Sequence, residues 1–154
     1  MSSEISSWRR EVNSGIIERL ASAHSISIYV MIGAGAALGG MLRYACSGLL
    51  VRIAGETFPW GTLAVNVVGS AVLGFVATLT APEGRLLVPV STRLMVTVGL
   101  CGGFTTFSTF SMETMALALD RQYLRAGLNV GGTVLACLIG VWCGYAVAST
   151  LNQR

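Results

Sequence analysis

Four long apolar stretches, separated by short charged segments, dominate the pattern of the chain. They cover about residues 25–50, 60–80, 86–119 and 126–151, and each is long enough for an α-helix to cross a bilayer core of roughly 30 Å. Continuous apolar blocks of this length favour helical spans over a barrel, whose strands alternate apolar and polar residues. The sequence therefore predicts an all-α integral membrane protein with four transmembrane helices.

The third apolar stretch is too long for one simple span, and its centre, residues 99–111, is rich in glycine and hydroxyl side chains. Polar groups at this depth are costly without partners. We therefore expect the helix to break near the middle of the membrane. Discontinuous helices of this kind commonly line ion sites, because their freed backbone groups can face an ion. The alternative is that each hydroxyl bonds to the preceding turn of its own helix. That alternative explains one or two hydroxyls better than the five found between positions 105 and 111.

Polar side chains recur at every fourth position on the second and fourth stretches and form one stripe on each predicted helix. An amide or hydroxyl in such a stripe either faces a permeation path or joins helices through hydrogen bonds. Together with a broken helix, the two stripes favour a narrow path for a small solute. The residues are Thr62, Asn66 and Ser70 on the second stretch, and Asn129, Thr133 and Cys137 on the fourth.

Phe107 and Phe110 are three positions apart and share a helix face, a spacing that normally indicates packing. The edges of their rings are electropositive, so they could also stabilise an anion without a trapping charge. A small, strongly hydrated anion needs hydrogen bonds that replace those to water, but it must also be able to leave the site. Neutral donors meet both needs. The aromatic pair and the neutral stripes together favour an anion pathway.

The composition supports a membrane protein and excludes several other classes. Hydrophobic residues make up 53% of the 154 residues and charged residues only 11%, too few to cover a water-facing surface. The net charge of +3 comes from scattered arginines, which form no patch for nucleic acid. The only histidine, His24, precedes the first stretch, and the sequence has no nucleophile–base pair or metal motif. We therefore do not expect an enzyme.

Residues 1–24 carry charged side chains of both signs and lack the order of a cleaved signal peptide. We expect a non-membrane extension there, followed by a single four-helix channel domain over residues 25–151. Four spans place both termini on one side, and the arginines near the span ends divide almost evenly between the two sides. This weak bias permits insertion in both directions, and the small size favours assembly. We therefore predict an antiparallel, dual-topology homodimer in the lipid bilayer.

Glu113 is the only carboxylate well inside a predicted span. A proton-coupled exporter needs such a group, because the carboxylate must exchange a proton for its substrate. A small dual-topology transporter that uses Glu113 is therefore the alternative to a channel, and a non-transporting membrane subunit is a third possibility. A transporter predicts flux that requires a pH gradient, a channel predicts passive flux, and a structural subunit predicts none.

Three segments resemble the Fluc (CrcB) fluoride channel family, in the family's order and within about residues 30 to 145. They are 39–44 (GGMLRY), 61–66 (GTLAVN) and 102–110 (GGFTTFSTF). The resemblance implies a passive, fluoride-selective channel that exports cytoplasmic fluoride and relieves fluoride toxicity. It also implies an antiparallel homodimer with two pores in the plasma (inner) membrane of a microbe, without an organic cofactor.

The same resemblance implies roles for individual residues. Phe107 and Phe110 match pore-lining phenylalanines, and the backbone carbonyls of Gly102 and Thr105 would hold a structural Na⁺ at the dimer centre. Relatives often carry Tyr, Ser and Ser along the fourth helix, where this chain has Asn129, Thr133 and Cys137. The Cys137 thiol is a weaker polar group than the serine hydroxyl at that position in the relatives. Arg43 would lie at a vestibule or snorkel to the membrane interface. The predicted fluoride pore comprises Phe107, Phe110, Asn66, Ser108, Thr109, Thr62, Asn129, Thr133 and Arg43.

Overall fold

The structure is a computed structural model that describes the backbone of residues 2–153 and the side chains of residues 25–153. Within this described part all regular secondary structure is helical, as the sequence predicts. The predicted extension, residues 1–24, lies outside the residues whose side chains are described. In chain order the segments are α1 (Ser2–Ala54), α2 (Trp60–Leu79), α3 (Val90–Leu94), the π-helical η1 (Met95–Cys101), α4 (Gly102–Phe104), α5 (Phe107–Leu119) and α6 (Tyr123–Asn152).

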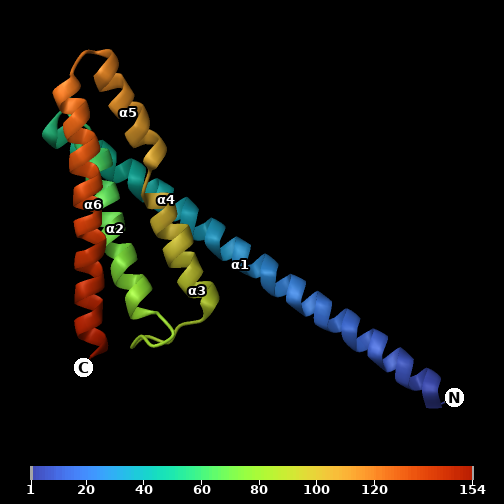
Figure 1. The fold of residues 1–154 in the computed structure, drawn as a ribbon. Coiled ribbons are helices and arrows are strands. Elements are labelled where there is room, and N and C mark those ends of the chain that lie inside the picture. Colours follow the sequence, from blue (N-terminus) through green and yellow to red (C-terminus); the bar gives the residue numbers. More distant parts are fainter. Residues whose placement is uncertain (1, 154) are drawn as a thin grey trace.

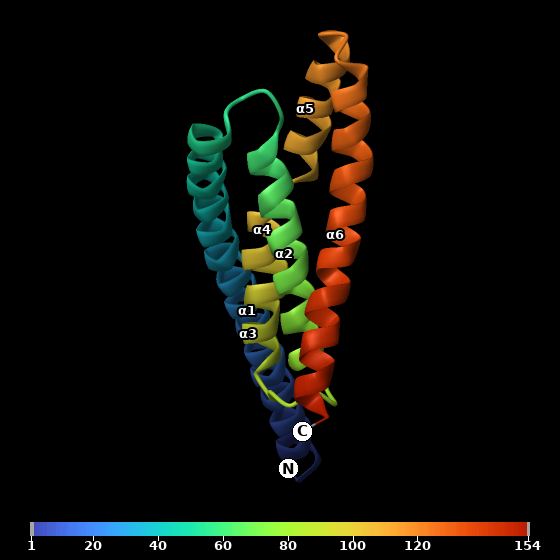
Figure 2. The ribbon, with the colours of Figure 1, turned by 90° about the vertical axis from the view of Figure 1, so that its left-hand side faces the viewer.

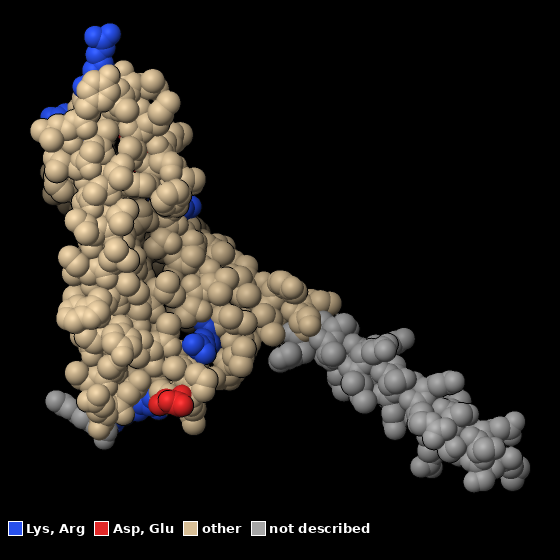
Figure 3. All heavy atoms as spheres, in the orientation of Figure 1, with Lys and Arg blue, Asp and Glu red and all other residues tan. Residues whose placement is uncertain are grey.

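Four helical stretches of the described residues are long and apolar enough to cross a membrane. Apart from the start of the first span, where the described side chains begin, each boundary lies within about one helical turn of the predicted one. Charged side chains gather mainly near the two ends of the bundle, and the flank between them is largely uncharged (Figure 3). The chain is therefore a multi-pass membrane protein. The spans are Ser25–Ala54, Trp60–Leu79, Val90–Leu119 and Tyr123–Asn152.

Helices α2 and α6 form the closest helix pair and run side by side (Figures 1 and 2). Glycines allow this approach: a Cβ on Gly144 would collide with the carbonyl oxygen of Ala71, and one on Gly74 with that of Val141. Without a hydrophobic driving force in lipid, such close backbone packing is a main source of helix association. Gly140 and Gly144 are four residues apart on α6, and both meet the backbone of α2, so this small-residue spacing coincides with a helix interface.

Helix α1 crosses the bundle obliquely and packs against η1 and α4 (Figure 1). A Cβ on Gly35 would collide with the carbonyl oxygen of Met95, and one on Gly39 with that of Leu100. Gly103 of α4 meets the backbone of Ala36 in the same way. These contacts hold the end of α4 against α1 and so fix the position of the residues that follow it.

Candidate functional site

The backbone between α4 and α5 is extended at two residues. Thr105 has φ −85° and ψ 157°, and Thr106 has φ −151° and ψ 116°. Thr106 then serves as the N-cap of α5, because its Oγ1 accepts a hydrogen bond from the amide of Thr109 at 3.2 Å. The helical ladder is therefore interrupted at this point, and the amides and carbonyls around it need other partners.

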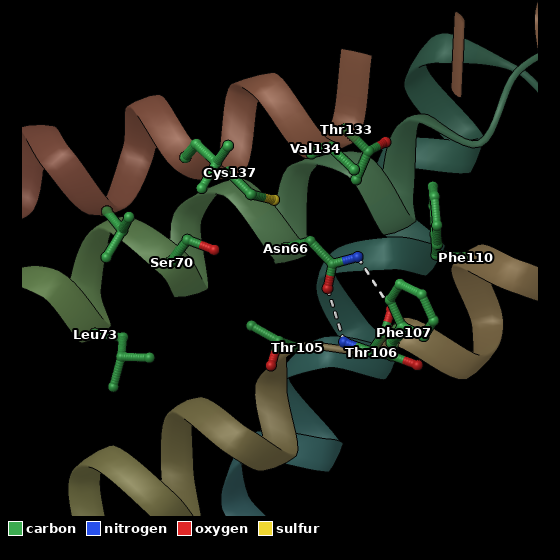
Figure 4. A pocket seen from close by; sticks show the side chains of 12 residues that line it. Asn66, Ser70, Leu73, Thr105, Thr106, Phe107, Phe110, Thr133, Val134 and Cys137 are labelled. Carbon is green, nitrogen blue, oxygen red and sulfur yellow. Dashed lines mark hydrogen bonds between the residues drawn. The ribbon is translucent and has the colours of Figure 1, made fainter. Parts of the chain in front are cut away.

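Asn66 of α2 supplies partners for the extended segment. Its Nδ2 donates to the carbonyl oxygen of Thr106 at 3.0 Å, and its Oδ1 accepts from the amide of Thr106 at 2.7 Å (Figure 4). The side-chain amide thus pairs with the backbone of one residue in both directions, which holds the α4–α5 junction against α2. One of the two Nδ2 hydrogens is still available for another acceptor.

The same bonds leave two carbonyls outside the helical ladder. The amide of Thr106, which would normally donate to the carbonyl of Gly102, donates to Asn66 instead. The amide of Thr109, which would normally donate to the carbonyl of Thr105, donates to the Thr106 hydroxyl. The Thr105 carbonyl accepts a long hydrogen bond, 3.3 Å, from Nη1 of Arg43. Hard backbone oxygens outside the helical ladder therefore lie at both positions that the sequence resemblance links to sodium, and the Thr105 oxygen has Arg43 as a donor.

A cavity of about 430 Å³ lies beside the interruption, between α2, α5 and α6 (Figure 4). No charged side chain is among the described residues that line it; its polar lining consists of amide, hydroxyl and thiol groups. Four residues of the predicted pore border this cavity, and so do two members of the polar stripes that were not assigned to the pore. They are Asn66, Phe107, Phe110 and Thr133, and then Ser70 and Cys137.

Phe107 and Phe110 form a tilted pair beside the cavity. Their ring centroids lie 5.4 Å apart with an interplanar angle of 44°. Phe110 is buried, at 7% exposure, whereas Phe107 is 77% exposed on the single chain. The Phe110 ring therefore packs within the subunit, and the Phe107 ring is open to whatever adjoins α5.

Ser108 and Thr109, two further predicted pore residues, belong to the cap of α5. The Thr106 hydroxyl donates to Oγ1 of Thr109 at 3.0 Å and lies 3.3 Å from Oγ of Ser108. Neither residue lines the 430 Å³ cavity. Sequence reasoning did not single out Thr106, the centre of this network, although a threonine just before a helical stretch is a recognised N-cap signal.

Thr62 and Asn129 belong to a second polar cluster nearer the other end of α5. Thr62 donates to Oε1 of Glu113 at 2.8 Å, and Asn129 donates to Oγ1 of Thr114 at 2.8 Å. Oδ1 of Asn129 accepts from Thr133 at 3.2 Å. Neither Thr62 nor Asn129 lines the 430 Å³ cavity. The residues of each predicted stripe thus divide between two environments.

Glu113 connects this cluster to a second cavity of about 620 Å³. Its Oε2 is buried and has no hydrogen-bond partner among the described side chains. The second cavity also has Glu56, Asp120 and Arg125 in its wall. It is therefore charged and predominantly acidic, in contrast to the neutral cavity beside Asn66.

Comparison with known proteins adds a family match over most of the chain. The family model described as CrcB-like protein, Camphor Resistance (CrcB), matches residues 30–145. A fluoride-specific ion channel FluC of Opitutus terrae is 54% identical over 83% of this chain and 97% of its own length. Fluoride-specific ion channels FluC of Paramagnetospirillum magneticum and Geobacter sulfurreducens are 50% and 44% identical, over 81% and 75% of this chain and 98% and 91% of their own lengths.

Proposed function

Because the chain belongs to the CrcB family, we propose that it is a passive, fluoride-selective ion channel that exports cytoplasmic fluoride and so relieves fluoride toxicity. The observation that carries the proposal is the neutral polar cavity beside the α4–α5 junction. As a multi-pass protein of a bacterial membrane, it would act without ATP or an organic cofactor. Its polar groups would replace the water around the ion, and no substrate would be chemically changed.

Fluoride is small and holds its water strongly, so a conducting path must offer several hydrogen bonds without a fixed positive charge that would trap the ion. The remaining Nδ2 hydrogen of Asn66 is such a donor at a position fixed by the bonds to Thr106. The positive edges of Phe107 and Phe110 add electrostatic stabilisation that weakens quickly with distance. The combination favours passage of an anion over its capture.

The full pore requires a second copy of the chain in this proposal. The cavity is open on the single subunit, and the exposed ring of Phe107 borders it. We propose that two chains pack as an antiparallel, dual-topology homodimer, with the α4–α5 interruption near the membrane midplane. A second subunit would close the cavity and surround Phe107. The nearly even division of arginines between the two sides supports insertion in both orientations.

A structural Na⁺ fits the donor chemistry at the interruption. The carbonyls of Gly102 and Thr105 lie outside the helical ladder, and hard oxygen ligands suit a hard cation. In the proposed dimer, these carbonyls of the two subunits would hold the ion. Arg43 contacts the Thr105 carbonyl in the single chain, so it would share or release that oxygen when the ion binds. Bound sodium would supply positive charge and join the subunits.

The alternative of a proton-coupled transporter based on Glu113 has no support from the comparisons, since the relatives are named as fluoride-specific channels. Glu113 lies away from the neutral cavity and accepts a hydrogen bond from Thr62. Its surroundings are those of a carboxylate held by a neighbouring helix. The proposal therefore assigns conduction to the neutral cavity.

Fluoride efflux from liposomes that contain only this purified protein tests the function. Valinomycin carries the potassium counter-current, a fluoride electrode reads the release, and chloride-loaded liposomes are the selectivity control. We expect rapid fluoride release, negligible chloride release and no requirement for a pH gradient. Release that depends on a pH gradient and disappears in Glu113→Gln would instead identify the transporter. No release from a verified dimer in sodium would contradict a channel formed by this chain alone.

A further inference from the structure

Most polar side chains that line the neutral cavity already donate their protons inside the protein. The Thr105 hydroxyl donates to the carbonyl of Cys101 at 3.0 Å, and the Thr133 hydroxyl donates to Oδ1 of Asn129 at 3.2 Å. The Thr106 hydroxyl donates to Thr109. A hydroxyl carries one proton, so none of these groups can donate to an anion without breaking an existing bond. The cavity is therefore poorer in available donors than its composition indicates.

Ser70 is the exception among these hydroxyls. It lies one helical turn beyond Asn66 on α2 and borders the cavity (Figure 4). Within residues 25–153, its hydroxyl makes no hydrogen bond. Several other helical hydroxyls of this chain bond to a carbonyl of the preceding turn; Thr78 donates to the Gly74 carbonyl at 2.8 Å and Thr114 to the Phe110 carbonyl at 2.7 Å. The Ser70 proton is thus available at the cavity wall.

The opposite wall offers little to replace this donor. Cys137 of α6 borders the cavity, and a thiol is a weak hydrogen-bond donor. The remaining lining beyond this level is apolar, with Leu73, Leu138 and Val141. Ser70 therefore marks the last strong neutral donor between the Asn66 amide and the apolar end of the cavity. An anion beside Ser70 would find no other hydroxyl in the cavity lining with a proton free to donate.

We infer that Ser70 is a fluoride-binding residue of the pathway, and that its hydroxyl donates a hydrogen bond to the ion next to the free Nδ2 hydrogen of Asn66. This inference rests on the proposed channel function. Two donors one helical turn apart allow fluoride to pass from one to the other before the first bond is fully lost. Hydrogen bonds to an ionised partner are roughly twice as strong as neutral ones, so loss of one donor in a dehydrated site raises the barrier strongly.

The test compares wild-type protein with Ser70→Ala and Ser70→Cys in the liposome efflux assay, with dimer content checked by gel filtration. We expect Ser70→Ala to lower the fluoride rate by at least about tenfold, as the loss of a hydrogen bond to an ion implies. Ser70→Cys, which keeps a weak donor, should fall between wild type and Ser70→Ala. Thr78→Ala is the matched control on the same helix, because its hydroxyl bonds to Gly74, and its rate should stay within about twofold of wild type.

The outcomes separate this inference from the channel function. Fluoride release from wild type with an unchanged rate in Ser70→Ala overturns the role of Ser70 and leaves the channel intact. Equal losses in Ser70→Ala and Ser70→Cys overturn it too, because the effect then follows the change of side chain and not donor strength. Absence of fluoride release from wild-type dimers refutes the channel function, and the role of Ser70 with it.

Discussion

Asn66 and Asn129 lie on two helices that pack against each other, α2 and α6, and both are buried, yet their amides have different partners. Asn66 bonds to the backbone of Thr106 and borders the neutral cavity. Asn129 bonds to the side chains of Thr114 and Thr133 and borders neither cavity. One amide therefore shapes a cavity wall, and the other joins two helices.

The surroundings of the two amides differ in charge as well. The cavity beside Asn66 has no charged lining side chain, whereas the cluster around Asn129 lies near Glu113, next to a cavity that also contains Glu56 and Asp120. Carboxylates repel an anion, and an anion in a low-dielectric site is especially sensitive to them. Under the proposed function, the fluoride path would therefore follow neutral donors that border an uncharged cavity, and not intramembrane polarity alone.

The largest effect that would sharpen this contrast is expected from Phe107→Ile. We predict that fluoride release falls to the background of protein-free liposomes, because the aliphatic side chain has no electropositive edge to face the anion. Phe107 is 77% exposed on the single chain but would face the partner subunit in the proposed dimer, so the free energy of unfolding should fall by about 1 kcal/mol while the dimer stays folded. Fluoride efflux and thermal unfolding in detergent measure the two effects.

Met112→Ile provides the control for this prediction, because Met112 is also on α5 and is 69% exposed. Its fluoride rate should remain close to wild type. Normal fluoride throughput in a purified, dimeric Phe107→Ile protein would remove the ring from the mechanism. Phe110→Ile should also abolish flux while the dimer stays folded, but with an additional stability loss of about 1 kcal/mol, because Phe110 is buried.

A smaller but more discriminating effect is expected when each asparagine is replaced by leucine. Asn66→Leu leaves the amide and carbonyl of Thr106 without their partners, which should cost about 1–3 kcal/mol for each buried group. We predict at least a tenfold loss of fluoride rate per folded dimer. Asn129→Leu should also lower stability, but its rate per folded dimer should stay within about threefold of wild type. Thermal unfolding and efflux, both normalised to dimer content, measure this pair.

The reverse result would contradict the comparison. If Asn129→Leu abolishes flux in a folded dimer while Asn66→Leu conducts, the path follows the charged cluster and not the neutral cavity. If both lose flux equally, the whole stripe on α6 borders the path, as the sequence resemblance implies for Asn129 and Thr133. The first of these outcomes would also remove the basis for the role of Ser70, because it takes the path away from the cavity that Ser70 borders.

Hydropathy is enough to predict the four spans, because the bilayer fixes how long an apolar helix must be. Small-residue spacing is a less certain guide. Gly140 and Gly144 meet the backbone of α2, but a Cβ on Gly127 or Gly131, with the same spacing on the same helix, would find open space. The pattern shows where a close approach is possible, and only the tertiary arrangement shows where a neighbour is present.

The polar stripes show the same limit for the candidate site. Thr62, Asn66 and Ser70 share one helix face, but each step of four residues also rises about 6 Å along the axis. Thr62 therefore meets Glu113, Asn66 meets Thr106, and Ser70 meets the cavity. Spacing predicts the common face. The separate partners depend on which residue of another helix lies at each height, which local sequence does not encode.

The smallest predicted effect concerns the weak donor opposite Ser70. Cys137→Ser keeps the size of the side chain and replaces a thiol with a hydroxyl at the cavity wall. If available protons limit passage at this level, the fluoride rate should rise, by no more than about threefold, since Ser70 already supplies one donor. Cys143→Ser, an exposed site on α6 away from the cavity lining, is the matched control and should leave the rate unchanged. A tenfold loss in Cys137→Ser would mean that a second strong donor holds the ion too tightly, so the weak thiol would be a requirement for release.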